Sequence, residues 1–334
     1  METVSLVAIS IAVAISVAVT LIVVRMLAAR APQAAQVPQA SKPDAAAPSP
    51  AAAPANAPST RIDVAPPYKL VQSRHGWMLV NPNDAYLGQA IVQYGECCEI
   101  EVAFLLQLLS IRPGLVMEIG TNIGTHTVPL AKALARQNRR LLAFEPQPVI
   151  FQNMCANLAL NALGNVMAWP SACGDRAATL YFSQPDYAAG GNFGGVSMSA
   201  EPVANGVAIP CIELDEVFGG ETVSLMKVDV EGFELLVLQG AEVIIDRSRP
   251  VLYVENDRPE KSSELIEWLW SKEYRLWWHT PPLFNPSNFF ANPNDVYPRI
   301  VSINMLCLPR EAEVPVNGLQ EIVVNRHPLE GAPA

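Results

Sequence analysis

The sequence predicts an α/β protein in which helices cover both faces of a doubly wound, seven-stranded, mainly parallel sheet. Two observations support this fold. Short apolar segments alternate along the chain with segments whose apolar residues recur at helical spacing. A glycine-rich turn follows the first apolar segment, and the acidic residues Glu145, Asp229 and Glu255 end later ones. Because such folds bind ligands at the carboxyl ends of their strands, we expect a binding site at this edge of the sheet.

The expected elements begin at about residue 68. Five central strands are expected at residues 115–117, 141–144, 165–170, 224–228 and 250–254, and two closing strands at 274–279 and 300–308. Helices are expected at residues 96–110, 128–139, 151–163, 233–246 and 261–272. Two extra strands, 177–184 and 207–214, are expected to flank a glycine-rich loop at 190–199. This order implies right-handed crossovers between parallel strands.

The amino-terminal segment predicts a membrane anchor. Residues 4–24 carry no charge and would form a helix about 31 Å long, enough to cross a bilayer. A secretory signal peptide cleaved near Ala29 or Ala31 is the alternative, but no Lys or Arg precedes the apolar run. Since Arg25 and Arg30 follow the run, the positive-inside rule places the rest of the chain in the cytoplasm. We therefore expect a single-pass membrane protein.

Composition divides the chain into four parts. We expect a transmembrane anchor at residues 1–27, a disordered Ala/Pro-rich linker at 28–67, the folded domain at 68–312 and a tail at 313–334. The linker has almost no large apolar residues, so it cannot bury enough surface to fold. It serves either as a tether that lets the domain reach its substrates or as a simple spacer.

Charge and cysteine usage exclude several classes of function. The net charge of −10 and the absence of a basic stripe argue against a nucleic-acid partner. The six cysteines show no C-x-x-C spacing, and the four histidines form no i, i+4 pair, so no metal site is expected. The adjacent Cys97 and Cys98 are either a redox pair or, as we favour, small buried residues.

The glycine turn indicates a nucleotide site without fixing the nucleotide. Residues 115–127 read LVMEIGTNIGTHT, so Asn122 stands where the dinucleotide motif G-x-G-x-x-G requires glycine. Glu145 lies 25 residues beyond Gly120 and ends the second strand, where a carboxylate can accept both hydroxyls of a ribose. This acid fits a dinucleotide or a cofactor with a ribose and no pyrophosphate, and Asn122 disfavours the former.

Three motifs resemble the FkbM-type S-adenosylmethionine-dependent methyltransferases. They are VMEIGTNIGTHT, AFEP (143–146) and MKVDVEGFELLVLQGA (226–241), and the resemblance extends from about residue 86 to 310. Glu118 and Thr121 stand where the family often has Asp and Ala. The resemblance implies a class I, Rossmann-like methyltransferase fold and S-adenosyl-L-methionine as cofactor. The implied reaction is O-methylation of a glycan, a lipid-linked sugar or a secondary metabolite. The alternatives are a non-catalytic cofactor-binding or scaffolding module and a nicotinamide oxidoreductase.

The resemblance also implies a set of cofactor-binding residues. The turn would shape the pocket for the methionine part, Glu145 and Pro146 would hold the ribose, and the segment after the third strand would contact adenine. The set comprises Glu118, Gly120, Thr121, Asn122, Gly124, Thr125, Glu145, Pro146, Ser171, Ala172 and Asp175. For Glu118 the alternative is a residue at the strand end that caps the following helix.

Catalytic residues are expected just after the fourth strand. Asp229 is the candidate base or acceptor-orienting group, and Glu231 is the second candidate for this role. The alternative for Glu231 is that it caps the following helix. The acceptor is expected to contact Asn288, Phe289 and Phe290, because amides and aromatic rings suit hydroxyl-rich molecules. Ordinary turn formation by Asn explains the same segment without a function.

Overall fold

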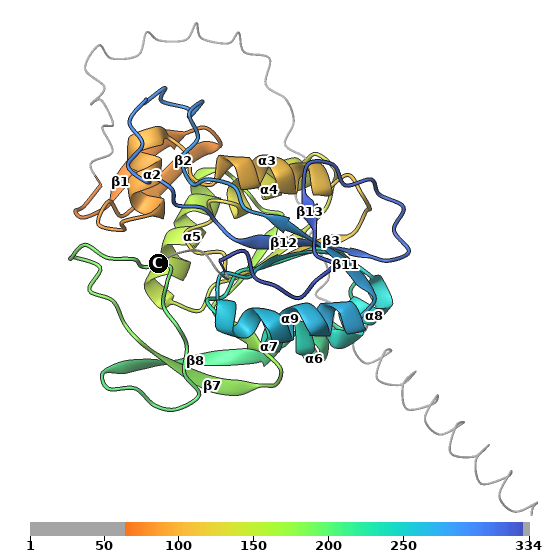
Figure 1. The fold of residues 1–334 in the computed structure, drawn as a ribbon. Coiled ribbons are helices and arrows are strands. Elements are labelled where there is room, and N and C mark those ends of the chain that lie inside the picture. The colour runs from red at the N-terminus through yellow and green to blue at the C-terminus, as the bar shows by residue number, and fades with distance from the viewer. Residues whose placement is uncertain (1–63, 330–334) are drawn as a thin grey trace, which may run out of the picture. The chain divides into compact units, whose positions relative to one another are not determined.

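The computed structural model describes residues 64–329, which form a sheet with helices on both faces (Figure 1). The predicted membrane span at residues 4–24 and almost all of the predicted linker lie outside these described residues. Within residues 64–329, no helix is both long and apolar enough to cross a membrane.

The central sheet has eight strands in the order β13-β11-β12-β10-β9-β3-β4-β5. Five of them are parallel: β10 (Val251–Glu255), β9 (Val223–Val228), β3 (Leu115–Ile119), β4 (Leu141–Phe144) and β5 (Val166–Trp169). Antiparallel pairing adds β12 (Asn304–Pro309), β11 (Tyr274–His279) and β13 (Gln320–Glu321). The α/β class and the parallel core of the sheet are confirmed.

The predicted number of seven strands is wrong by one. The eighth strand, β13, consists of two residues within the predicted tail and pairs with Trp277 and Trp278 of β11. Two residues are too short to show a period of two, so the sequence held no signal for this strand.

Helices cover the two faces of the sheet. On one face lie α2 (Leu87–Tyr94), α3 (Glu99–Leu108), α4 (Thr127–Ala135) and α5 (Pro148–Leu160). On the other lie α6 (Leu214–Phe218), α7 (Glu234–Gln239), α8 (Glu242–Ser248) and α9 (Pro259–Ser271). The strand residues alternate between the two cores: Val251 and Tyr253 face the first group, Leu252 and Val254 the second.

Residues 233–246, predicted as one helix, form two helices, α7 and α8. The break falls at Gly240, where an added Cβ would lie 1.9 Å from the backbone oxygen of Gly174. Because the two backbones pass this close, only glycine fits at this position. The first helix ends here, and the second begins two residues later.

Two small sheets complete the domain. A hairpin of β1 (Lys69–Ser73) and β2 (Gly76–Val80) precedes α2 and was not predicted. The other sheet, β6-β8-β7, is formed by Ala172–Gly174, Gly206–Glu213 and Ala178–Ser183. The last two are the extra strands expected from the sequence, and they project from the layered core (Figure 1).

Candidate functional site

Two adjoining cavities lie at the carboxyl ends of the parallel strands. The larger has a volume of about 310 Å³ and is lined by residues that follow β3, β9 and β10 and by the start of β12. The smaller, of about 50 Å³, lies toward the ends of β4 and β5. Gly120, Glu145, Gly194, Asp229 and Glu231 line both, so the two cavities meet at these residues.

The glycine turn passes directly over the end of β9. Gly120 has φ +84°, and a Cβ there would lie 1.7 Å from the backbone oxygen of Asp229. Only glycine allows this approach together with a positive φ. Asn122 is also left-handed, with φ +49°, and lines the larger cavity together with Thr121 and Thr125.

Glu145 is held by backbone donors from both sides. The N–H of Asn122 donates to its Oε2 at 2.9 Å and the N–H of Gln147 donates to its Oε1 at 2.9 Å. Burial raises the pKa of Glu145 to about 7, and the charge of Asp229 adds to the rise, while the two backbone hydrogen bonds lower it. The carboxyl is therefore fixed in position and lies within reach of both cavities.

The structure brings most of the predicted adenine and ribose contacts to the smaller cavity. Pro146, Ser171 and Ala172 line it. The Oγ of Ser171 is buried and makes no hydrogen bond to any described residue. Asp175 does not line either cavity, because it lies beyond this segment and pairs with Arg176 at 3.3 Å.

Two other predicted cofactor residues do not reach the cavities. Glu118 is fully buried in β3, opposite Lys227 of β9, and lines neither cavity. Burial raises its pKa, and neither of its carboxylate oxygens has a hydrogen-bond partner among residues 64–329. Gly124, with φ +88°, shapes the turn without lining either cavity.

Asp229 and Lys227 form a close ion pair at the end of β9. The Nζ of Lys227, which is 2% exposed, lies 2.8 Å from Oδ2 of Asp229. Burial favours the neutral form of Asp229, but the charge and hydrogen bond of Lys227 outweigh it and hold the pKa of the carboxyl below its usual value. An acid of low pKa is a poor proton acceptor, so this geometry suits orientation and charge stabilisation better than proton abstraction.

Residues 118–276 match the family model described as the Methyltransferase FkbM domain. Just under half of the chain is thus similar to the FkbM methyltransferase family. The predicted recognition is thereby confirmed, and the matched region contains all of the predicted cofactor-binding and catalytic residues. The comparison with curated proteins found no match.

Solved structures similar to this chain include several methyltransferases. The FkbM methyltransferase of Methylobacillus flagellatus KT shares 15% identity and a TM-score of 0.38 over 58% of this chain and 43% of its own. A putative O-methyltransferase from Klebsiella pneumoniae shares 14% identity and a TM-score of 0.40 over 64% and 80%. The Pyrococcus abyssi tRNA (uracil-54, C5)-methyltransferase in complex with S-adenosyl-L-homocysteine shares 12% identity and a TM-score of 0.39 over 72% of this chain and 44% of its own. This chain thus spans less than half of the M. flagellatus chain.

Glu231 has an unusual backbone and an arginine partner. Its φ is +56°, in the region that favours glycine, and Arg258 donates to its Oε2. Burial raises the pKa of Glu231 to about 7, with a further contribution from the charge of Asp229. The capping alternative does not describe its contacts, since it is Glu234 that accepts from the N–H groups of Val230 and Gly232.

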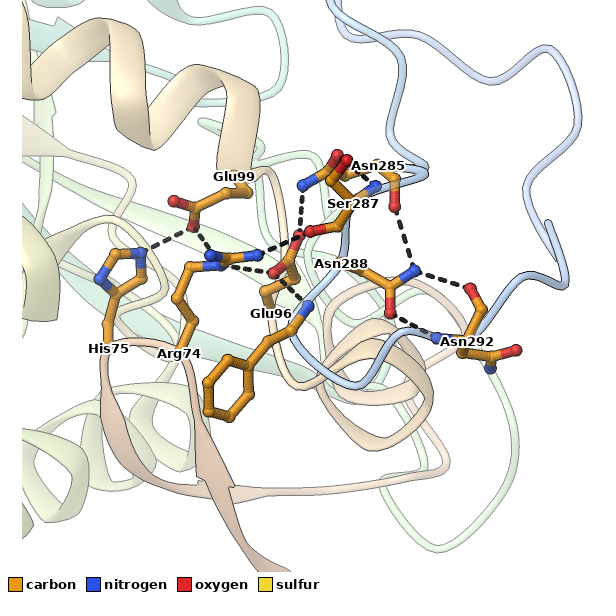
Figure 2. Close-up of polar contacts among 9 residues, drawn as sticks. Arg74, His75, Glu96, Glu99, Asn285, Ser287, Asn288 and Asn292 are labelled. Atoms are coloured by element: carbon orange, nitrogen blue, oxygen red, sulfur yellow. Dashed lines mark hydrogen bonds and ion pairs between the residues drawn. The ribbon is translucent and has the colours of Figure 1, made fainter.

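The predicted acceptor residues Asn288, Phe289 and Phe290 lie in a loop after the matched region and do not line the cavities. This loop is tied to the turn of the amino-terminal hairpin, where Arg74 donates to the carbonyl of Ser287 at 2.9 Å (Figure 2). It is also tied to Glu96, which follows α2 and accepts from the N–H of Phe289 at 2.8 Å. Asn288 is buried and holds its own loop through the carbonyl of Asn292. Phe289 and Phe290 are about half exposed, and all three predicted residues lie outside both linings. Turn formation by the asparagines, the alternative given above, accounts for this loop.

The larger cavity contains acids that were not predicted to act there. Glu255 and Asp257 line it from the end of β10, with Asn304 from β12. The sequence did carry a signal for Glu255, which ends a buried strand just as Glu145 does. Glu101 lines the cavity from α3, 3.6 Å from Nε2 of His126. It had no such signal, because an acid within an apolar helix looks like a solvent-facing residue.

Proposed function

We propose that this chain is an S-adenosyl-L-methionine-dependent O-methyltransferase acting on a hydroxyl-bearing, neutral or cationic acceptor. The supporting observation is the continuous pair of cavities at the carboxyl ends of the strands, with a ribose-type acid between them. S-Adenosylmethionine would supply the methyl group.

We assign the region of the smaller cavity, together with the adjoining edge of the larger one, to the adenosine part of this cofactor. Glu145 offers two carboxylate oxygens to a ribose diol, and the buried Oγ of Ser171 has no protein partner. A buried hydroxyl without a partner costs about 1–3 kcal/mol, which a polar ligand atom would recover. Phe144, Val196 and Phe233 supply apolar walls for a flat base. No pyrophosphate-binding G-x-G-x-x-G turn is present in the sequence.

The rest of the larger cavity is left for the acceptor. Its lining from β9, β10 and β12 contains Glu231, Glu255, Asp257 and Asn304. Carboxylates repel phosphates and accept hydrogen bonds from hydroxyls and cations, so a sugar-like acceptor fits better than a polyphosphate. We propose a glycan, a lipid-linked sugar or a hydroxylated secondary metabolite, and no nucleic acid. Asp229 would orient the acceptor at the junction of the two cavities.

Calorimetry tests this proposal. We expect S-adenosylhomocysteine to bind the full-length chain and NAD to leave no signal. Binding of NAD alone would support an oxidoreductase, and binding of neither would overturn the proposal. A protein that binds S-adenosylhomocysteine but transfers no labelled methyl group to any extract of a deletion strain would support the non-catalytic module.

We also propose that residues 1–27 anchor the protein to a membrane with the catalytic domain in the cytoplasm, where the methyl donor is made. The uncharged run at residues 4–24 and the arginines after it support this topology. Protease added to sealed, right-side-out vesicles should spare the domain. Digestion without prior lysis would contradict the orientation.

A further inference from the structure

Three carboxylates converge in the larger cavity, beside the ends of β9 and β10. Glu231 follows β9, Glu255 ends β10 and Asp257 follows Glu255. One oxygen of each lies within 4.8 Å of the corresponding oxygens of the other two. Oxygen ligands lie about 2.0–2.6 Å from a bound Mg²⁺ or Ca²⁺, so oxygens this close together can share a single ion.

Arg258 is the cation nearest the three acids, and it forms ion pairs with only two of them. Lys227 is committed to Asp229, and Arg258 contacts Glu231 and lies 3.3 Å from Oδ1 of Asp257. Glu255 forms no ion pair within residues 64–329. Among the described residues, Glu255 is thus the one acid of the cluster without an ion-pair partner.

Two buried polar atoms without partners, one on Glu255 and one on the residue opposite it, indicate a bound ligand. The Oε2 of Glu255 itself is buried and makes no hydrogen bond to the described residues. Directly opposite, in the ladder of β10 with β12, stands Asn304, which is 3% exposed and whose Nδ2 also has no described partner. Side chains of paired residues project from the same face of a sheet, and both residues line the cavity. These two unpartnered polar atoms indicate, independently of the carboxylate cluster, that a polar or charged ligand binds here.

We propose that Glu231, Glu255 and Asp257 bind a hard divalent cation of the Mg²⁺, Mn²⁺ or Ca²⁺ type. Oxygen-only ligands favour these ions over zinc, which prefers nitrogen and sulfur. The amide of Asn304 can turn its oxygen toward the ion without losing a hydrogen bond at Nδ2. Arg258 is 37% exposed, so its side chain has room to withdraw. The histidines and cysteines gave no hint of this site, because its ligands come from the ends of separate strands.

The use of the ion rests on the proposed function. A divalent cation in this half of the cavity would bind an oxygen of the acceptor and make its hydroxyl more acidic. The acidified hydroxyl would release its proton to water, so that Asp229 would not need to accept it. The binding of the ion itself depends only on the geometry of the three carboxylates.

Manganese binding tests the site directly. The full-length protein, without cofactor or acceptor, is titrated with MnCl₂ while electron paramagnetic resonance reports the free Mn²⁺. We expect one saturable site. Glu255→Gln and Asp257→Asn should each weaken it by more than roughly tenfold, since even outer-shell changes at metal sites cost about 10- to 100-fold. Glu264→Gln, which removes an equal charge from the exposed face of α9, should leave binding unchanged. Arg258→Gln should tighten binding, because it removes the competing cation.

The outcomes separate this proposal from the proposed function. No Mn²⁺ site in the wild type, or a site that Glu255→Gln leaves intact, would overturn the proposal. Calorimetry with S-adenosylhomocysteine on the same proteins reports on the fold and on the cofactor site. Mn²⁺ binding without S-adenosylhomocysteine binding would support the metal site and reject the methyltransferase. S-Adenosylhomocysteine binding without Mn²⁺ binding would reject the metal site and leave the proposed function standing.

Discussion

Glu145 is the residue on which the cofactor assignment depends most. Glu145→Gln should weaken S-adenosylhomocysteine binding about 10- to 100-fold, because a charge-assisted hydrogen bond contributes roughly 1.5–3 kcal/mol. Wild-type affinity should also rise as the pH passes about 7, where the carboxyl ionises, and this rise should be absent in the variant. Calorimetry at several pH values measures both effects.

Asp175→Asn is the matched control for that experiment. It also removes an acid of the predicted cofactor set, but one that pairs with Arg176 and lines neither cavity. We expect its affinity to equal that of the wild type. Equal affinities for Glu145→Gln and the wild type would remove Glu145 from the ribose site.

Asp229 acts, in our interpretation, on the reaction and not on cofactor affinity. Asp229→Asn should leave S-adenosylhomocysteine affinity within a few-fold of wild type and reduce methyl transfer by about 10²-fold or more, through lost orientation and charge. Transfer of labelled methyl groups to an extract of a deletion strain provides the measurement. Lys227 keeps Glu118 as a neighbour across the ladder, so the variant should still fold. Unchanged transfer would exclude Asp229 from the mechanism.

The turn between β3 and α4 is the element that fixes the site. Gly120→Ala combines a positive φ with a Cβ placed 1.7 Å from the backbone of Asp229, so the turn must move away from β9. We expect S-adenosylhomocysteine binding to be lost and the midpoint of urea unfolding to fall. Gly164→Ala is the control, since nothing lies within 4 Å of an added Cβ there. Normal binding by Gly120→Ala would show that the turn does not contact the cofactor.

The elements show which parts of the site a sequence can predict. Acids that end buried parallel strands, such as Glu145 and Asp229, were placed correctly at the cavities because strand ends share one edge of the sheet. Glu118 was misplaced because one residue along a strand reverses the direction of the side chain. The loop at Asn288 could not be positioned, because its place is set by Arg74 and Glu96, about two hundred residues away in sequence.

At the scale of the whole domain, the sheet divides the site into two halves. The strands β3, β4 and β5 carry the glycine turn, Glu145 and Ser171, while β9, β10 and β12 carry the three carboxylates and Asn304. Asp229 stands where the halves meet. The order of the strands, which the sequence pattern alone could not establish, thus separates the part of the site that we propose for the cofactor from the part that we propose for the acceptor.

A buried acid of raised pKa also sets how the folded domain responds to pH. Glu145 titrates near 4.5 when unfolded and near 7 when folded, facing Asp229 and Tyr187. Its contribution to stability is complete below about pH 4.5 and is lost as the pH rises through 7, a change of roughly 3 kcal/mol. Urea unfolding of the ligand-free protein at pH 5, 6, 7 and 8 should therefore show falling stability up to about pH 7. In Glu145→Gln the decline should be smaller by that amount, and an equal decline in both proteins would mean that Glu145 is not the group responsible.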